Sequence, residues 1–183
     1  MNPTVVAVIV IAVLIVAAVA FIGWRKRQGE RLKQHFGPDY EHQVQAAGGS
    51  RVKAEAELLR REKRADKLEI HPLPPERRDA FAADLKEVQA RFVDDPQRAI
   101  ALADALLAEV MKARGYPVED FEQRAADISV DHPQVVANYR AAHDIAVKHG
   151  QGKGDTEDLR AAFIGYRSLF EEMLNEKAPE PAH

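Results

Sequence analysis

The hydrophobic pattern divides the chain into two kinds of segment. The first is a continuous apolar run from Val5 to Gly23 that contains no charged residue. Beyond it, apolar residues recur every three or four positions, which is the spacing of amphipathic helices. No window alternates apolar and polar residues for long enough to indicate a strand. The pattern therefore predicts an all-α protein whose first helix differs in kind from the others.

The apolar run predicts a transmembrane helix over residues 5–24, preceded by a short extracytoplasmic N-terminus at residues 1–4. About 20 helical residues cross the hydrocarbon core of a bilayer. Two other interpretations stay open: a signal peptide cleaved after Ala20, which would release an exported helical domain, and a buried core helix. Residues 1–4 contain no Lys or Arg, which disfavours a signal peptide. The run has no polar face, which disfavours a core helix.

The segment directly after the run is basic, and Glu30 is the single acid within it. Basic flanks are retained on the cytoplasmic side of a membrane, so we expect the N-terminus outside and the C-terminal domain in the cytoplasm. The same cations suit contact with anionic lipid, at about 1 kcal/mol each near the surface. We expect a lipid bilayer as partner and no nucleic acid, because the chain beyond is acidic and the net charge is -3. The predicted anchor flank consists of Trp24, Arg25, Lys26, Arg27, Arg31 and Lys33.

Residues 25–70 predict a basic helical stalk. Gly37-Pro38 and Gly48-Gly49 interrupt it, and Ser50 is positioned to cap a helix rich in Ala, Glu, Lys, Arg and Leu. The heptad seam of that helix is too short for a coiled coil, so we expect a solvated helix or one packed lightly on the domain. Residues 71–75, His-Pro-Leu-Pro-Pro, predict a stiff extended linker and the best domain boundary in the chain.

Residues 76–176 predict a helical bundle of four main helices and a short one, followed by a disordered tail at residues 177–183. Asp95, before Pro96, and Asp120 are expected N-caps, Asp155 or Thr156 should cap the last helix, and Gly115 should end a helix. The expected core stripes are Phe81, Leu85, Val88 and Phe92; Ala99, Leu102, Leu106, Val110 and Ala113; Val136, Tyr139, His143 and Val147; and Leu159, Phe163, Tyr166, Phe170 and Met173.

The densest polar cluster is VEDFEQRAADISVDHP, residues 118–133. Its carboxylates and histidine are the groups that a hard cation or general acid–base chemistry would use. Helix capping and surface solvation are the other interpretation, because two of the acids stand where helices need N-caps. No metal or catalytic motif has the required spacing, and the chain contains no Cys, so we expect no cofactor. The candidate functional surface consists of Asp120, Glu122, Arg124, Asp127, Asp131 and His132.

Three stretches carry a resemblance: RFVDDP at residues 91–96, RGYPVEDFEQRAADISVDHP at residues 114–133 and VVANYRAAH at residues 135–143. Together they resemble a group of bacterial single-pass membrane-anchored helical proteins of unknown function. The resemblance covers most of the chain. It implies an architecture, one membrane helix and a small helical domain, and no catalytic residues.

These observations favour a non-enzymatic single-pass membrane protein that presents its helical domain to a protein partner in the cytoplasm. A groove between Ala-rich helices suits a partner helix. One alternative is a membrane-tethered enzyme or metal-binding domain that uses residues 118–133, and another is the exported domain released after Ala20. The sequence does not indicate the partner or the oligomeric state.

Overall fold

The computed structural model describes residues 3–153 and 155–175, with side chains from residue 11 onward. These residues form eight helices and no strand, which confirms the all-α prediction. The expected tail at residues 177–183 lies outside the described residues, as do residues 1–2. The helices are α1 (Pro3–Phe36), α2 (Pro38–Ala46), α3 (Arg51–Ala65), α4 (Pro75–Arg91), α5 (Pro96–Arg114), α6 (Phe121–Asp131), α7 (Pro133–Gly150) and α8 (Thr156–Asn175).

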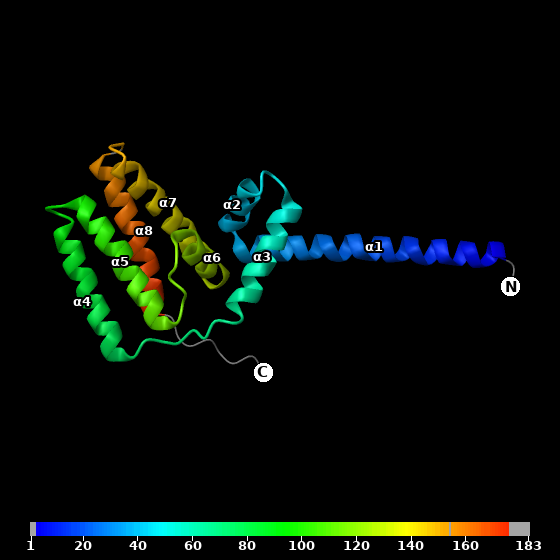
Figure 1. Ribbon diagram of the computed structural model, residues 1–183, viewed down its shortest axis with the longest axis horizontal. Coiled ribbons are helices and arrows are strands. Elements are labelled where there is room, and N and C mark those ends of the chain that lie inside the picture. Colours follow the sequence, from blue (N-terminus) through cyan, green and yellow to red (C-terminus); the bar gives the residue numbers. More distant parts are fainter. Residues whose placement is uncertain (1–2, 154, 176–183) are drawn as a thin grey trace.

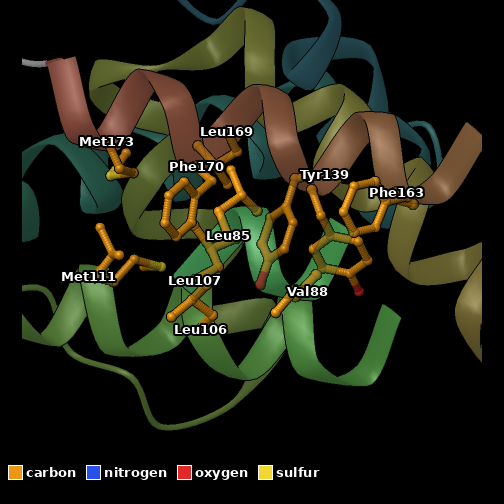
Figure 2. Close-up of a cluster of buried hydrophobic side chains, with 14 of the residues drawn as sticks. Leu85, Val88, Leu106, Leu107, Met111, Tyr139, Phe163, Leu169, Phe170 and Met173 are labelled. Carbon is orange, nitrogen blue, oxygen red and sulfur yellow. The ribbon is translucent and has the colours of Figure 1, made fainter. Parts of the chain in front are cut away.

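Helices α4 to α8 form a bundle around the main core (Figure 1). Helix α8 packs along both α5 and α7, and α4 packs on α5. Figure 2 shows how the aromatic residues of α8 fill the space above the Leu and Met side chains of α5. Most of the expected stripe residues are buried here, whereas Ala113 and Val147 are exposed. The buried stripe residues include Phe81, Leu85, Val88, Leu106, Tyr139, Tyr166, Phe170 and Met173, and the core also contains Leu107, Met111 and Leu169, which the stripes did not include.

The helix boundaries follow local capping chemistry. The Asp95 carboxylate accepts a hydrogen bond from the Arg98 N–H at 3.0 Å, and Pro96 occupies the first turn of α5. Asp155 caps α8 in the same way, through the N–H of Asp158 at 2.9 Å. Each cap satisfies a backbone donor that the first turn of a helix leaves without a partner. The expected caps at Asp95 and Asp155 are therefore confirmed.

The segment between α3 and α4 is extended and lies against the C-terminal end of α5. The His71 N–H donates to the carbonyl of Arg114 at 2.8 Å. Gly115 ends α5 in the left-handed region, at φ 98°, and a Cβ there would lie 2.3 Å from the carbonyl oxygen of Glu69. Only glycine accommodates both the backbone angle and this close approach. The linker is therefore fixed to the bundle rather than held away from it.

Helices α2 and α3 form a hairpin that packs on the last turns of α1 (Figure 1). A second, smaller core fills their junction with the bundle. It joins Leu32 and Phe36 of α1 and Leu58 of α3 to Val130 of α6, together with Tyr40 of α2. The stalk predicted at residues 25–70 is thus helical, but its helices fold back on one another and dock against α6 and α7.

Helix α1 is a single helix of 34 residues that extends away from the rest of the protein (Figure 1). Its large apolar side chains from Ile11 to Ile22 are each between 57% and 68% exposed. Within the part of the chain whose side chains are described, no helix combines the length and the hydropathy needed to cross a membrane. The transmembrane helix at residues 5–24 therefore stays a prediction.

Candidate functional site

The candidate surface of residues 118–133 forms α6 and its cap. Asp120 accepts a hydrogen bond from the Gln123 N–H at 2.8 Å, as expected of an N-cap. Helix α6 packs on α7 and on α3, so most of its side chains face other helices. Arg124, Asp127 and His132 are buried, whereas Asp120, Glu122 and Asp131 are exposed. The segment is therefore mainly an internal contact surface.

The structure separates the six candidate residues rather than gathering them. Glu122 binds Arg140 of α7 at 2.7 Å, and Asp127 binds Arg64 of α3 at 2.7 Å. Three more side chains point toward other elements: Arg124 to Asp104 of α5 at 3.3 Å, Asp131 to Tyr116 at 3.5 Å, and His132 to Glu172 of α8 at 3.4 Å. Among the described residues, no three His, Asp or Glu side chains are placed to hold a metal ion.

A buried carboxylate that the sequence did not single out, Asp39, lies at the centre of the charged contacts. It is the second residue of α2, and its side chain is fully buried. One oxygen accepts from Arg61 of α3 at 3.0 Å, and the other accepts from Arg140 of α7 at 3.1 Å. Asp39 therefore joins α2, α3 and α7. Its partner Arg140 lies 101 positions away in the sequence.

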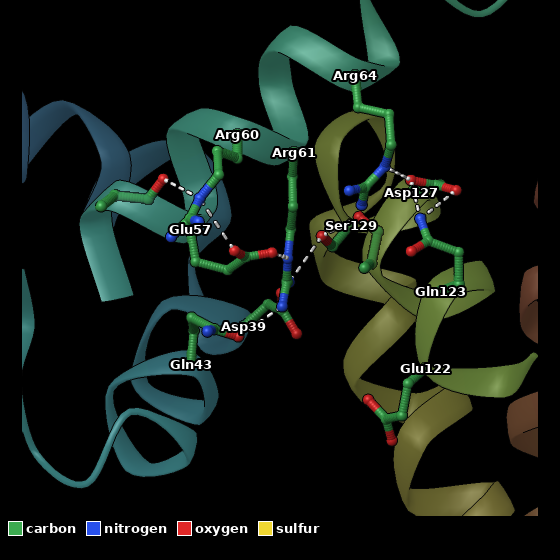
Figure 3. Close-up of polar contacts among 12 residues, drawn as sticks. Asp39, Gln43, Glu57, Arg60, Arg61, Arg64, Glu122, Gln123, Asp127 and Ser129 are labelled. Atoms are coloured by element: carbon green, nitrogen blue, oxygen red, sulfur yellow. Dashed lines mark hydrogen bonds and ion pairs between the residues drawn. The ribbon is translucent and has the colours of Figure 1, made fainter. Parts of the chain in front are cut away.

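The partners of Asp39 are themselves nearly buried. The Arg61 side chain is 7% exposed and also donates to Gln43 and to the Ser129 hydroxyl (Figure 3). Burial lowers the pKa of the Arg61 guanidinium, and the nearby Asp39 carboxylate partly opposes this change. An arginine remains charged under such a shift, so Arg61 needs its anionic partner.

A second ion pair, of which only the carboxylate is buried, continues this contact toward the end of α3. Arg64 donates to the fully buried Asp127, which also accepts two hydrogen bonds from the Gln123 amide, each 2.9 Å long (Figure 3). We call the six residues of these pairs the ion-pair interface: Asp39, Arg61, Arg64, Glu122, Asp127 and Arg140. Removing one partner of a buried pair leaves an uncompensated charge, at a cost of about 3–5 kcal/mol. The docking of α2 and α3 on the bundle therefore depends on Asp39, Arg61 and Arg140.

The predicted anchor flank borders a groove between α1 and the α2–α3 hairpin, with a volume of about 400 Å³. We call it the α1 groove. Phe21 and Ile22 lie at its apolar end, and Arg25, Lys26 and Lys33 line the remainder from α1. The hairpin completes it with Tyr40, Arg51 and Glu55, and Gly29 and Glu30 belong to α1.

The remaining flank residues lie outside the α1 groove. Arg31 binds Glu62 of α3 at 2.7 Å, and Trp24, 59% exposed, borders a neighbouring hollow lined by Val52 and Leu59 of α3. Arg27 is exposed on α1. The basic pattern after the apolar run thus indicates the α1 side of this region, whereas no sequence pattern distinguishes Arg51 and Glu55 of α3.

A further groove lies at the end of the bundle between α4, α5 and α8, with a volume of about 420 Å³. We call it the distal groove. Phe92 and Phe163 form part of its lining, and Val93 and Ile164 are 84% and 52% exposed at its edges. These two side chains extend the apolar lining of the groove onto the surface.

Comparison of the chain with protein-family models, with curated proteins and with solved structures found no match.

Proposed function

We propose that this chain is a single-pass membrane protein that holds a helical domain at the cytoplasmic surface and binds another protein there. The observation that carries the proposal is α1, whose apolar side chains from Ile11 to Ile22 are exposed and are followed by a basic segment. Such a surface is unfavourable in water. A bilayer removes it from water without requiring a polar face.

The length of the apolar segment supports this proposal. Val5 to Gly23 carries no charge, and the side chains of residues 5–10 precede those that the structure describes. Together with the exposed residues from Ile11 onward they match the length of about 20 residues that a bilayer requires. Trp24 stands at the expected interface, and Arg25 to Arg27 follow it at once, which favours a cytoplasmic C-terminal domain.

Membrane extraction of two matched variants tests the anchor. Val16→Arg places a charge in the middle of the apolar segment, at a cost of about 2.5–3.5 kcal/mol for insertion. We expect the wild-type chain to stay in the membrane pellet after alkaline carbonate, and this variant to be partly released. Gln34→Arg adds the same charge on exposed α1 beyond the segment and should behave as wild type. A wild-type chain found in the supernatant would refute the anchor.

Protease protection tests the orientation separately. In sealed inner-membrane vesicles of known sidedness, the helical domain should be digested only when the cytoplasmic face is accessible. Digestion from the opposite face would support the exported alternative, as would a mature N-terminus that begins after Ala20 in mass spectrometry.

The proposed protein contact is at the distal groove, and we assign it to an amphipathic helix of a partner. The groove offers apolar walls from three helices, so a helix with an apolar stripe fits its shape. Val93→Asp should abolish stoichiometric co-purification of a partner from detergent extracts. Ala83→Asp makes the same kind of change at an exposed position of α4 outside the groove, and it should leave co-purification intact. Equal loss in both variants would argue against this surface.

A further inference from the structure

We propose that the α1 groove binds the phosphate group of an anionic glycerophospholipid, with the acyl chains directed toward Phe21 and Ile22. The inference rests on the membrane anchoring proposed above, because it places the groove at the level of the lipid headgroups. It adds a defined lipid site to what would otherwise be a general attraction between cations and the membrane surface.

The lining of the groove has the polarity of a phospholipid. Its apolar end, Phe21 and Ile22, continues the exposed apolar surface of α1, and its polar end lies against the α2–α3 hairpin. A lipid whose acyl chains run beside α1 would place its phosphate at the hairpin residues that line the groove. The volume of about 400 Å³ is sufficient for a headgroup, within the range of small-ligand sites.

The charge of the groove favours an anion. Four cations line it, against the two carboxylates of Glu30 and Glu55. Lys33 binds Glu41 at 3.1 Å. In the described part of the chain, Arg25, Lys26 and Arg51 form no ion pair within 4 Å, so three cations are available to phosphate oxygens. Arginine and lysine at a membrane surface bind such oxygens through charge-assisted hydrogen bonds.

The hairpin side of the groove is held in position by its own contacts. The Tyr40 hydroxyl donates to the Glu55 carboxylate at 3.1 Å, and this carboxylate lies over Gly29. The groove therefore has a fixed wall, which distinguishes it from a flexible run of basic residues.

Arg51 distinguishes a defined binding site from a general attraction between basic residues and anionic lipid. It belongs to α3 and reaches the groove only because α2 and α3 fold back on α1. If a polybasic segment attracted lipid by charge alone, the preference for anionic lipid would depend mainly on Arg25 to Arg27. Removal of any one cation from α3 would then change that preference by the same amount. If the site requires this fold, the lipid preference changes when Arg51 is replaced and stays the same when a cation on another face of α3 is replaced.

The single tryptophan supplies the probe, because Trp24 follows the apolar segment directly and is exposed beside the groove. The full chain is reconstituted in phosphatidylcholine vesicles that contain a small fraction of either brominated phosphatidylglycerol or brominated phosphatidylcholine. Bromine quenches tryptophan fluorescence at contact range. The ratio of the two quenching curves gives the relative affinity for the anionic lipid at Trp24.

We expect the wild-type chain to prefer phosphatidylglycerol and Arg51→Ala to reduce that preference roughly fivefold, the effect of one cation near the surface. Lys53→Ala removes an equal charge from an exposed position two residues away that does not line the groove, and it should keep the wild-type ratio. Glu55→Gln removes a groove carboxylate while its amide oxygen still accepts from Tyr40, and it should increase the preference. An effect in this opposite direction is not produced by loss of folding.

The outcomes separate the site from the anchor. If the chain does not integrate into the vesicles, the anchor and the site are both refuted. If it integrates and shows no lipid preference, or if Arg51→Ala and Lys53→Ala reduce the preference equally, only the lipid site is refuted. Displacement of the lipid by millimolar inorganic phosphate would reassign the groove to a soluble anion and likewise overturn the proposal.

Discussion

The bundle core and the ion-pair interface hold helices together by opposite means. In the bundle, α5, α7 and α8 meet through apolar side chains such as Leu107 and Phe170, which require only the right size and shape. At the interface, α2, α3 and α7 meet through Asp39 and two buried arginines, beside the smaller apolar core. The first contact tolerates many sequences, whereas the second depends on Asp39 and both of its arginines.

This difference has a consequence for how the two parts of the protein separate. Loss of a core side chain weakens the whole bundle, because its helices share one core. Loss of a charge at the interface weakens the docking of α2 and α3 alone, while the bundle retains its own core. The two contacts can therefore be broken independently.

The largest expected effect is in the main core. Phe170 is 1% exposed, and Phe170→Ala should lower the free energy of unfolding by about 3–5 kcal/mol through lost burial and the cavity left behind. Chemical denaturation of the full chain in detergent, followed by circular dichroism, measures it. Ile164→Ala, on the exposed side of the same helix, is the control and should cost less than about 1 kcal/mol. Similar losses in both would contradict the assignment of Phe170 to the core.

The next effect should be confined to the hairpin. Asp39→Ala leaves Arg61 and Arg140 buried without their shared anion, at a cost of about 3 kcal/mol to docking. Hydrogen exchange should then accelerate in α2 and α3 and stay unchanged in α8. Glu122→Ala removes a carboxylate whose side chain is 74% exposed, so it should change exchange in the hairpin only slightly. Equal acceleration in α8 would show that the two contacts are not independent.

Alkaline pH should weaken the bundle more than the hairpin. Burial raises the pKa of Tyr139 and Tyr166 above the ordinary value of 10.0, and the nearby Asp104 acts in the same direction. The folded protein therefore keeps protons that the unfolded chain releases, so stability is full below about pH 10 and falls as the pH rises beyond it. The expected loss is about 1.4 kcal/mol per pH unit for each tyrosine.

Thermal unfolding at pH 9 and pH 11 measures this loss. Tyr139→Phe should be less stable at pH 9, because its hydrogen bond to Asp104 is removed, but should lose less on going to pH 11. Phe163→Leu, a core change without a titrating group, should keep the wild-type difference between the two pH values. An unaltered difference in Tyr139→Phe would exclude this tyrosine as a source of the alkaline effect.

The smallest expected effect concerns an exposed ion pair and its contribution to the free energy of unfolding. Arg91 and Glu87 lie 2.5 Å apart on α4, and both side chains are more than half exposed. Water and salt screen such a pair, so Arg91→Ala should change the free energy of unfolding by less than about 0.5 kcal/mol. A loss approaching that of Asp39→Ala would mean that burial does not set the strength of these pairs.

The helices of the bundle could be predicted because their signals are local. Asp95 and Gly115 mark helix ends through contacts within a few residues, and the stripe from Leu159 to Met173 repeats at helical spacing. A reader of the sequence needs no knowledge of distant segments to use these signals. The all-α class follows from them directly.

The ion-pair interface could not be predicted because its partners are distant in the sequence. Arg61 stands in a helix so rich in charge that one buried arginine has no distinguishing pattern, although Ala54 and Leu58 lie on the same helical face. That spacing of four and three residues was the available signal. The acids of residues 118–133 looked like a shared site because they are close in sequence, but α6 directs neighbouring side chains to different helices.

Helix α1 has no break between its apolar segment and Phe36, and its last turns are locked into the hairpin and the bundle. At about 1.5 Å per residue the helix is roughly 50 Å long. The apolar segment is therefore joined to the folded part of the protein by continuous helix and not by a loop. The direction of the apolar segment is therefore fixed relative to the hairpin and the bundle, and with them relative to the distal groove.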